Sequence, residues 1–460
     1  MTDNHFSSLP LSAEFLANLE SLGYQSMTPI QAQSLPAILD GKDVQAQAKT
    51  GSGKTAAFAI GLLHKLDAKT YQTQALVLCP TRELADQVSK EIRRLARPIA
   101  NTKILTLCGG TPIRSQYDSL EHQPHIVVGT PGRVLKHLQK GTLKLQHLNS
   151  LVLDEGDRML DMGFYDDIIA ILHYTPTEKQ TLLFSATLPD AVKKISSKIQ
   201  KTPVDIKVES QHDQQIIKQI FYEIKSEQRL STLIALLQHY QPQSSVVFCN
   251  LKQECQDIAD HLSSQGFHTL ALHGDLDQRD RDQVLVQFAN KSCSVLIATD
   301  VAARGLDIKD LDAVINYELS PDPDIHTHRI GRTGRAGNAG IALSLFAARE
   351  AGRVVAIEQQ QNSRAVIQKP ASLKTSEHFT LTPAMTTLCI SGGRKDKMRP
   401  GDILGALTAN TPLEGKNIGK IDIFDKVSFV AIERSNAKQA LKILSEGKIK
   451  GRRYRVRRLN

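Results

Sequence analysis

Two short motifs in the chain have the residue types and spacing needed for phosphate chemistry. The first is the glycine-rich loop at residues 48–55 (Ala-Lys-Thr-Gly-Ser-Gly-Lys-Thr), and the second is the sequence at 154–157 (Asp-Glu-Gly-Asp), directly after the apolar run Leu151–Leu153. Glycines let backbone N–H groups curl around phosphates, and the N-terminal end of a following helix favours negative charge. Carboxylates at the end of a buried strand supply the oxygen ligands that Mg²⁺ prefers. Together the motifs predict a chain that binds and hydrolyses ATP.

Each residue type in these motifs has its own expected role. Lys54 is expected to reach the outer phosphates, and Thr55 to bind Mg²⁺. Asp154 is expected to hold the same ion, and Glu155 to orient or deprotonate the attacking water. The remaining loop residues are expected to contact the nucleotide: Ala48, Lys49, Thr50, Gly51, Ser52 and Gly53. The alternative for the carboxylate pair is a solvated turn after a strand, which the glycine-rich loop upstream disfavours.

Length and composition exclude several classes of protein. At 460 residues the chain is expected to form roughly three domains of about 150 residues each. No apolar run approaches the roughly 18 residues of a membrane span, and the N-terminus lacks the basic start and apolar stretch of a signal peptide. The six cysteines form no CxxC pair, so we expect buried free thiols in a reducing compartment and no zinc site. These features predict a cytoplasmic protein without a membrane partner.

The net charge of +9 is unevenly distributed along the chain. Residues 386–460 hold 17 Lys and Arg against 7 Asp and Glu, a local balance of +10, which leaves −1 for the first 385 residues. A basic segment joined to a near-neutral body indicates a module that binds a polyanion. The alternative is a solubilising basic tail, but the segment also has strand and helix patterning.

Short apolar runs alternate with helix-like segments in two successive stretches of the chain. The runs of the first stretch are Ala75–Cys79, Ile104–Cys108, Ile126–Val128, Leu151–Leu153 and Leu182–Phe184. Those of the second are Val246–Cys249, Leu270–Leu272, Val295–Ala298, Ala313–Ile315 and Ile341–Phe346. Strands that are apolar on both faces are typical of a parallel sheet covered by helices. The pattern predicts two α/β domains joined by the polar segment at residues 208–215.

The pattern changes after a polar, proline-flanked segment at residues 369–383. Strand-like and helix-like segments then follow in βαββαβ order: Thr387–Ser391, Asp402–Leu407, Gly419–Phe424, Val427–Glu433, Asn436–Ser445 and Arg453–Leu459. This order predicts a small α+β sheet domain of the RNA-recognition type. Its first strand has no aromatic residue and its third offers only Phe429, so we expect poor base stacking on the sheet.

Longer motifs resemble the DEAD-box family of ATP-dependent RNA helicases, in order along nearly the whole chain. Residues 24–31 (Tyr-Gln-Ser-Met-Thr-Pro-Ile-Gln) are similar to the family's adenine-reading Q motif, with Phe6 as the upstream aromatic residue. The resemblance implies that Phe6, Tyr24 and Gln31 bind the nucleotide. The Ser185-Ala186-Thr187 sequence is similar to the motif that couples the ATP state to work on RNA, and the resemblance implies a coupling role for Asp157 as well.

Further motifs resemble the family's RNA-side segments. They are residues 80–85 (Pro-Thr-Arg-Glu-Leu-Ala), 109–110 (Gly-Gly), 130–133 (Thr-Pro-Gly-Arg), 247–250 (Val-Phe-Cys-Asn) and 278–281 (Gln-Arg-Asp-Arg). Residues 298–307 resemble the segment that links RNA and ribose, and residues 328–335 the arginine-finger motif. The resemblance implies RNA contacts by Arg82, Gly110, Thr130, Arg133, Arg281 and Thr299. It implies nucleotide contacts by Gly305 and Asp307, a coupling role for His328, and catalytic arginines at Arg332 and Arg335.

The C-terminal segment narrows the resemblance to the bacterial DbpA subfamily. The segments that carry it are residues 385–394, 398–407 and 447–453. In that subfamily the domain binds a hairpin of 23S ribosomal RNA, and the helicase core remodels nearby helices of large-subunit assembly intermediates. The resemblance implies RNA contacts by basic residues, including Arg394, Lys395, Lys397, Lys448, Lys450, Arg452 and Arg453.

The resemblance also implies a fold and a division of the chain. The expected fold is two tandem RecA-like parallel-sheet domains, at residues 1–207 and 216–368, a linker at 369–383, and an RRM-like domain at 384–460. The expected activity is RNA-stimulated ATP hydrolysis, with Mg²⁺, that separates RNA strands locally rather than by tracking. The oligomeric state stays open, with a dimer through the C-terminal half as one alternative.

One position departs from the family motif, because Gly156 stands where the third letter is alanine. Glycine keeps the position small but adds backbone freedom beside Glu155. We expect a competent ATPase that is somewhat slower. The alternative function is an ATP-gated RNA clamp that hydrolyses little, which Gly156 alone favours, and a DNA helicase is disfavoured by the family resemblance.

Overall fold

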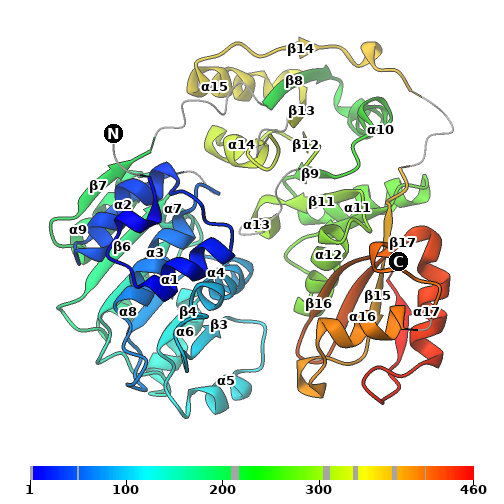
Figure 1. Cartoon of the computed structure of the whole chain (residues 1–460). Coiled ribbons are helices and arrows are strands. Elements are labelled where there is room, and N and C mark those ends of the chain that lie inside the picture. The colour runs from blue at the N-terminus through cyan, green and yellow to red at the C-terminus, as the bar shows by residue number, and fades with distance from the viewer. Residues whose placement is uncertain are drawn as a thin grey trace. The chain divides into compact units, whose positions relative to one another are not determined.

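The computed structural model describes residues 4–48, 51–208, 217–303, 311–334, 340–375, 381–409 and 411–459. These residues form two compact units, one within 4–208 and the other from 217 onward (Figure 1). The predicted nucleotide residues Lys49, Thr50, Gly305 and Asp307, and the predicted arginine Arg335, lie outside the described residues.

Within its described residues, the first unit contains a seven-stranded parallel sheet in the order β3-β4-β2-β5-β6-β1-β7. Its strands are β1 (Val44–Gln47), β2 (Ala75–Leu78), β3 (Ile104–Leu107), β4 (Ile126–Gly129), β5 (Ser150–Asp154), β6 (Gln180–Ser185) and β7 (Val204–Lys207). Leu76 and Val77 are neighbours on β2 but belong to different core clusters. Because successive side chains of a strand point to opposite faces, the sheet has a hydrophobic core on each side.

Helices precede and follow the strands of the first unit and cover both cores. They are α1 (Ala13–Ser21), α2 (Pro29–Leu39), α3 (Lys54–His64), α4 (Arg82–Leu95), α5 (Ile113–Leu120), α6 (Pro131–Gln139), α7 (Gly156–Asp161), α8 (Tyr165–Leu172) and α9 (Asp190–Ile199). In a parallel sheet the loops after the strands meet at one edge. The loops that precede α3, α4, α6 and α7 carry the predicted ATP and RNA motifs, so this edge gathers them.

The second unit contains, among its described residues, a parallel sheet in the order β10-β11-β9-β12-β13-β8-β14. Its strands are β8 (Ile217–Ile224), β9 (Ser245–Cys249), β10 (Thr269–Leu272), β11 (Val295–Thr299), β12 (Ala313–Asn316), β13 (Gly340–Ala347) and β14 (Ile367–Gln368). Its helices are α10 (Arg229–Tyr240), α11 (Lys252–Ser264), α12 (Gln278–Ala289), α13 (Asp300–Ala303), α14 (Pro323–Ile330) and α15 (Ala351–Gln361). Counted from its own first strand, this sheet has the same strand order as the first, so the two sheets share one topology.

The second unit also contains an antiparallel sheet with the order β16-β17-β15-β18. The strands are β15 (Met385–Ile390), β16 (Ile418–Ile423), β17 (Ser428–Glu433) and β18 (Val456–Arg458), and the helices are α16 (Pro400–Thr408) and α17 (Ala437–Glu446). The predicted βαββαβ order is therefore present. Leu388, Ile403, Val430 and Leu444 are among the side chains that form the core between sheet and helices.

One face of the antiparallel sheet is covered by α12 of the neighbouring parallel-sheet domain. Val286 of α12 lies in one hydrophobic cluster with Cys389 and Phe429. Asn290 donates a hydrogen bond to the Thr387 hydroxyl (Nδ2 to Oγ1, 3.2 Å). Phe429, the aromatic residue considered for base stacking, is buried in this contact with 2% exposure.

The predicted fold class is confirmed: two RecA-like parallel sheets and a C-terminal α+β sheet domain. The strands β1, β7, β8 and β14 were not predicted from the sequence. All six cysteines, each within the described ranges, are buried free thiols. Among the residues that the structure describes, no helix combines the length and apolar character needed to cross a bilayer.

Candidate ATP and RNA sites

The glycine-rich loop leads directly into α3. Gly51 and Gly53 have φ angles of +85° and +99°, which residues other than glycine rarely adopt. The buried side chain of Lys54 donates to the carbonyl of Ala48 (Nζ to O, 2.7 Å), so the lysine ammonium lies over the loop. The hydroxyl of Ser52 is buried and has no hydrogen-bond partner among the described residues. Loop, lysine and helix N-terminus thus form a cradle for phosphate.

Gln31 lies against this loop and is held at both ends of its amide. Its Oε1 accepts from the Thr28 backbone N–H (2.9 Å), and its Nε2 donates to the Gly53 carbonyl (3.1 Å). A Cβ at position 53 would lie 2.6 Å from Gln31 Nε2, so this contact requires glycine there. Phe6 packs edge-on against Tyr24, with ring centroids 6.0 Å apart. The structure therefore brings the predicted adenine-reading segment to the glycine-rich loop.

The carboxylate pair occupies the end of β5, as the sequence predicts. Asp154 is 2% exposed, and burial raises its pKa to about 7, although the nearby Lys54 ammonium opposes the shift. Glu155 has a φ of +54°, a left-handed conformation that costs a residue with a side chain on the order of 1 kcal/mol. That backbone turn ends the strand and starts α7. A cation bound beside Asp154 would favour its carboxylate form.

The donor set at this edge fits a magnesium ion. The Asp154 carboxyl and the Thr55 hydroxyl are hard oxygen ligands of the kind that Mg²⁺ takes together with phosphate oxygens and water. Asp154 is buried in the phosphate region beside Lys54. A carboxyl whose charged form is disfavoured by burial gains from a cationic partner.

Asp157 is the acceptor of a buried hydrogen-bond network, here called the Asp157 network. Its Oδ2 accepts from the Thr187 backbone N–H (3.0 Å) and from the Thr187 hydroxyl (2.8 Å). Its own backbone N–H donates to the Ser185 hydroxyl (3.1 Å), and its Oδ1 accepts from the Arg158 N–H (3.0 Å). The structure thus joins the three predicted coupling residues of the first unit: Asp157, Ser185 and Thr187.

The predicted RNA residues of the first unit lie on neighbouring loops. The guanidinium of Arg82, at the start of α4, lies beside Gly109, where an added Cβ would be 3.2 Å from Nη2. Gly110 has a φ of +79°. Thr130 precedes α6, and Arg133 on that helix donates to the Thr111 carbonyl (Nη1 to O, 3.1 Å).

Gln116 connects these loops, although no role was predicted for it. Its Oε1 accepts from Arg133 Nη1 (2.7 Å) and lies 2.9 Å from His137 Nε2. Its Nε2 donates to the Cys108 carbonyl (3.1 Å) and to the Thr111 hydroxyl (2.8 Å). Gln116 therefore orients Arg133 relative to the Gly109-Gly110 loop. A single glutamine on an amphipathic helix gives no signal in the sequence.

Arg329 of α14 is the centre of a second buried network, here called the Arg329 network. It forms a bidentate pair with Asp300 (Nε to Oδ1, 2.7 Å; Nη2 to Oδ2, 2.6 Å). It also donates to Asn250 Oδ1 (3.0 Å), Asn316 Oδ1 (3.2 Å) and the Glu318 carbonyl (2.6 Å). These residues lie at the ends of β9, β11 and β12, so one guanidinium links its own motif at 328–335 to the predicted motifs at 247–250 and 298–307. Arg329 lies within the predicted motif at 328–335, but no role was predicted for it.

The other predicted residues of the second unit lie around this network. Arg281 of α12 donates to the Ala302 carbonyl of α13 (Nη2 to O, 2.9 Å). Thr299 ends β11 with 9% exposure. His328 lies on α14 next to Arg329, with Nδ1 buried and unpartnered among the described residues. Arg332 follows α14 and its carbonyl accepts from the Leu311 N–H (3.3 Å).

The predicted basic residues of the C-terminal sheet domain lie on two loops that touch. Lys450 donates to the Lys397 carbonyl (Nζ to O, 2.9 Å), which joins the loop after β15 to the loop before β18. Both lysines have positive φ angles, +58° at Lys397 and +51° at Lys450. The predicted contacts on these loops are all exposed: Arg394, Lys395, Lys397, Lys448, Lys450, Arg452 and Arg453.

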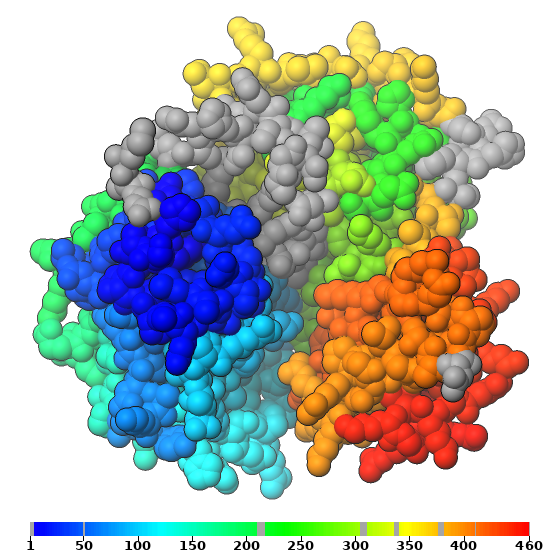
Figure 2. Space-filling model, in the orientation of Figure 1, coloured from blue at the N-terminus to red at the C-terminus, as the bar shows by residue number. Residues whose placement is uncertain are grey.

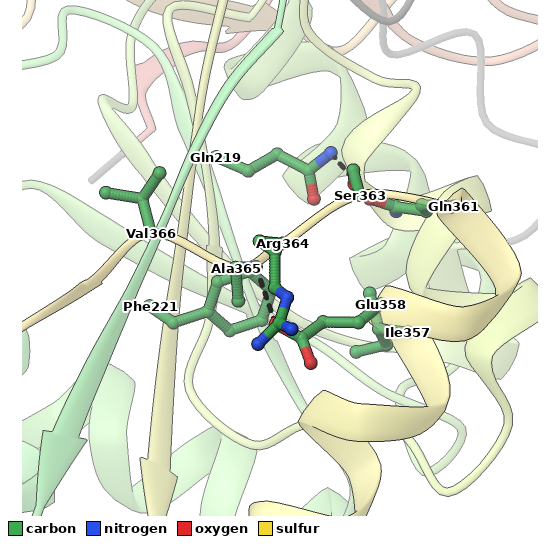
Figure 3. A pocket seen from close by; sticks show the side chains of 9 residues that line it. All are labelled: Gln219, Phe221, Ile357, Glu358, Gln361, Ser363, Arg364, Ala365 and Val366. Carbon is green, nitrogen blue, oxygen red and sulfur yellow. Dashed lines mark hydrogen bonds between the residues drawn. The ribbon is translucent and has the colours of Figure 1, made fainter.

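A shallow pocket in the second unit lies apart from every predicted site residue (Figure 3). It is formed by β8, the end of α15 and the segment at 363–366. Figure 3 shows Glu358 accepting from the Ala365 N–H (2.8 Å) and Gln219 hydrogen-bonded to Gln361 (3.0 Å). These side chains are already paired with one another, so the pocket offers few open polar groups.

Two RecA-like sheets, a glycine-rich loop with its lysine, and a carboxylate pair at the end of β5 define a helicase-type ATPase. Family models match in the same order: DEAD/DEAH box helicase at residues 28–195, helicase conserved C-terminal domain at 228–337, and DbpA RNA binding domain at 387–458. The chain belongs to the DEAD-box family of ATP-dependent RNA helicases and is of the DbpA type.

Similar proteins cover most of the chain. The ATP-dependent RNA helicase DbpA of Escherichia coli (strain K12) is 56% identical over 444 residues, which are 96% of this chain and 97% of that protein. The DEAD-box ATP-dependent RNA helicase CshA of Geobacillus kaustophilus is 42% identical over 80% of this chain and 79% of that one. A solved structure of S. cerevisiae Dbp5 bound to RNA and ADP BeF3 has a TM-score of 0.73 and 30% identity, and covers 80% of this chain and 96% of that chain.

Proposed function

We propose that this helicase hydrolyses ATP with Mg²⁺ in response to RNA and separates short ribosomal RNA helices locally. The proposed target is a hairpin of 23S ribosomal RNA within large (50S) ribosomal subunit assembly intermediates. The observation that carries the proposal is the joining of Lys397 and Lys450, which gathers the exposed basic residues on one pair of loops. A similar protein named DbpA, at 56% identity, supports the assignment to this type.

The nucleotide is proposed to lie between the glycine-rich loop and the end of β5. Lys54 would exchange its bond to the Ala48 carbonyl for bonds to the outer phosphates. Thr55 and Asp154 are proposed to hold Mg²⁺, which neutralises developing charge on the phosphates when it is bound. Glu155 is proposed to orient or deprotonate the attacking water. The base is proposed to meet Phe6, Tyr24 and Gln31.

The catalytic arginines are proposed to come from the second parallel-sheet domain. One lysine and one Mg²⁺ leave charge on the transferring γ-phosphoryl group, and an arginine finger accelerates such transfer by about 10³–10⁵-fold. Arg332 and Arg335 are proposed for this role, so hydrolysis requires domain closure. RNA bound by both domains favours the same closed state, which couples the two ligands. The S. cerevisiae Dbp5 structure bound to RNA and ADP BeF3 supports this use of the fold.

The C-terminal sheet domain is proposed to hold the ribosomal hairpin through its basic loops. Its sheet face is occupied by α12, with Phe429 and Cys389 in that contact, so ordinary base stacking on the sheet is not open to RNA. Exposed lysines and arginines on loops instead contact phosphates. The tethered domain raises the effective concentration of the helicase core near its target.

The division of the chain into domains at 1–207, 216–368 and 384–460 is proposed on the same grounds. The three family-model matches, at 28–195, 228–337 and 387–458, support these boundaries. A cytoplasmic location is also part of the proposal. The oligomeric state stays open, with a dimer through the C-terminal half as one alternative. Sedimentation of the full chain with and without RNA measures the oligomeric state.

The central test compares ATP turnover of the full chain with and without RNA that carries the 23S hairpin. We expect strong stimulation by the hairpin RNA and loss of turnover in Glu155→Gln, which keeps the side-chain size but removes the carboxylate. An absence of RNA stimulation, or equal turnover in Glu155→Gln, contradicts the proposal and favours an ATP-gated clamp.

The RNA contact itself is tested by the salt dependence of hairpin affinity. Lys448→Ala should reduce the slope of log affinity against log salt concentration by about 0.7–0.9, the value for one lost phosphate contact. Lys442→Ala, an exposed lysine on α17, is the matched control and should leave the slope unchanged. Equal slopes in the two variants would show that the loop lysine is an ordinary solvated charge.

A further inference from the structure

The ring of Tyr24 is held from outside its own segment by two side chains of α4. The Tyr24 hydroxyl donates a hydrogen bond to Glu91 Oε1. Arg94 pairs with the other carboxylate oxygen (Nη1 to Oε2, 3.3 Å), and its guanidinium carbon lies 6.0 Å from the centroid of the Tyr24 ring. We infer that Glu91 is a positioning residue for adenine recognition, because it fixes the orientation of the Tyr24 ring. This inference rests on the proposed contact between Tyr24 and the base.

The segment that carries Tyr24 is a short connection between α1 and α2. Bonds of its backbone also anchor the segment: among them, the Tyr24 N–H donates to the Leu19 carbonyl (3.0 Å), and Arg94 donates to the Leu22 carbonyl (Nη2 to O, 3.3 Å). These bonds fix the main chain, whereas the bond to Glu91 fixes the side chain. A hydrogen bond to a carboxylate is stronger than one between neutral groups. Burial and the Glu91 carboxylate both raise the pKa of the Tyr24 phenol, so the hydroxyl stays a donor at neutral pH.

Helix α4 is a rigid support for this contact. Its inner face, which includes Val88, Ile92 and Leu95, is buried in the core of the first unit. Asn18 of α1 adds a bond to the Leu95 carbonyl (Nδ2 to O, 3.1 Å), and Figure 1 shows α1 beside α4. In Figure 2 the deep-blue N-terminal segment lies at the surface of the first unit. A contact from an exposed segment to a packed helix places the ring more accurately than the segment alone.

Holding the ring also changes the thermodynamics of nucleotide binding. Phe6 contacts one side of Tyr24 edge-on, and Glu91 holds the hydroxyl. A ring already in its bound orientation loses less conformational freedom when the base arrives, which increases affinity. The effect is confined to ligands with a base, because the phosphates are bound by the glycine-rich loop. This base dependence distinguishes positioning from general loss of structure.

The test is a competition experiment with the full chain and a fluorescent ADP derivative. Glu91→Ala and Tyr24→Phe should each weaken ATP binding about fivefold to tenfold, since each removes the same charge-assisted hydrogen bond. The double variant should be no weaker than either single variant. Competition by inorganic tripolyphosphate, which has no base, should be unchanged in all three. Glu91→Gln keeps an acceptor oxygen and should restore part of the affinity.

The control is Asp86→Ala, which removes an exposed carboxylate five residues earlier on α4 and should bind ATP as the parent does. Equal losses for ATP and tripolyphosphate in Glu91→Ala would overturn the inference and show a structural role. Tyr24→Ala separates the two hypotheses. If it leaves ATP binding unchanged, the proposed base contact itself fails. If it weakens binding while Tyr24→Phe and Glu91→Ala do not, only the role of Glu91 fails.

Discussion

The two parallel-sheet domains share a strand order but join their motifs with opposite chemistry. In the first unit a carboxylate, Asp157, accepts bonds from two backbone N–H groups and a hydroxyl. In the second a guanidinium, Arg329, donates to the Asp300 carboxylate and to three neutral oxygens. The first network joins the ends of two strands, β5 and β6, whereas the second joins the ends of three. Arginine offers five donors in a planar fork, so one side chain connects more loops than a carboxylate can.

The difference predicts unequal costs when each centre is removed. The Arg329 side chain is 1% exposed and its partner Asp300 is 20% exposed, so the loss of one leaves the other as an unpaired charge in a poorly hydrated place. The donors that contact the Asp157 carboxylate are all neutral groups. Removing it leaves unsatisfied donors but no orphaned charge.

Arg329→Ala should therefore have the largest effect. We expect a loss of about 3–5 kcal/mol in the free energy of unfolding, the range for breaking a buried ion pair by removing one partner. Urea denaturation of the full chain measures it, with the loss confined to the transition of the second unit. Arg349→Ala, an exposed arginine before α15, is the control and should change stability by less than about 0.5 kcal/mol. Equal stability of the two variants would contradict the distinction between the networks.

Asp157→Ala should have a smaller effect on stability and a clear effect on coupling. Loss of the acceptor for three donors is expected to cost about 2–3 kcal/mol. Because the backbone N–H and the hydroxyl of Thr187 lose their acceptor together, RNA stimulation of ATP turnover should fall at least about tenfold, the change for roughly 1.4 kcal/mol, while the affinity for ADP is retained.

Ser185→Ala sharpens this reading because it removes only one bond, from the Asp157 N–H (3.1 Å). Its stability loss should be about 1 kcal/mol. If Ser185→Ala lowers the free energy of unfolding as much as Asp157→Ala does, Asp157 is not the centre of the network. If Asp157→Ala lowers ADP affinity as strongly as RNA stimulation, the network supports the nucleotide site rather than coupling.

Much of this architecture was predictable because the motifs sit at the ends of apolar strands. The runs around Val77, Val152 and Ile297 are apolar on both faces, which identified the parallel sheets. Four strands were missed for a physical reason. β1 (Val-Gln-Ala-Gln) and β7 (Val-Asp-Ile-Lys) alternate in polarity, β8 mixes polar and apolar residues, and β14 has two residues. Strands with polar positions lack the continuous apolar signal.

The network partners were not predictable for a different reason. Gln116, Arg329 and Glu91 act through contacts with residues distant in sequence, for example the 67 positions between Tyr24 and Glu91. A polar residue on an amphipathic helix has the same pattern whether it is solvated or bonded across the fold. Side-chain partners of this kind become visible only when the sheet order is known.

The smallest expected effect is at Gly156, the first residue of α7 and the neighbour of Asp157. A Cβ built there would lie 2.8 Å from Leu183 Cδ1, and Leu183 is fully buried. The methyl end of leucine must shift, which costs on the order of 1 kcal/mol, whereas Gly→Ala in a helix returns about 0.4–1 kcal/mol through the unfolded state. Gly156→Ala should therefore change stability by less than about 1 kcal/mol and RNA-stimulated turnover by less than about tenfold. Adding Leu183→Val, which shortens the contacting side chain, should recover any stability that the steric clash removes. A rise in turnover of more than tenfold in Gly156→Ala would show instead that backbone freedom beside Glu155 limits ATP turnover in the parent chain. That result would favour the ATP-gated clamp as the function of the parent.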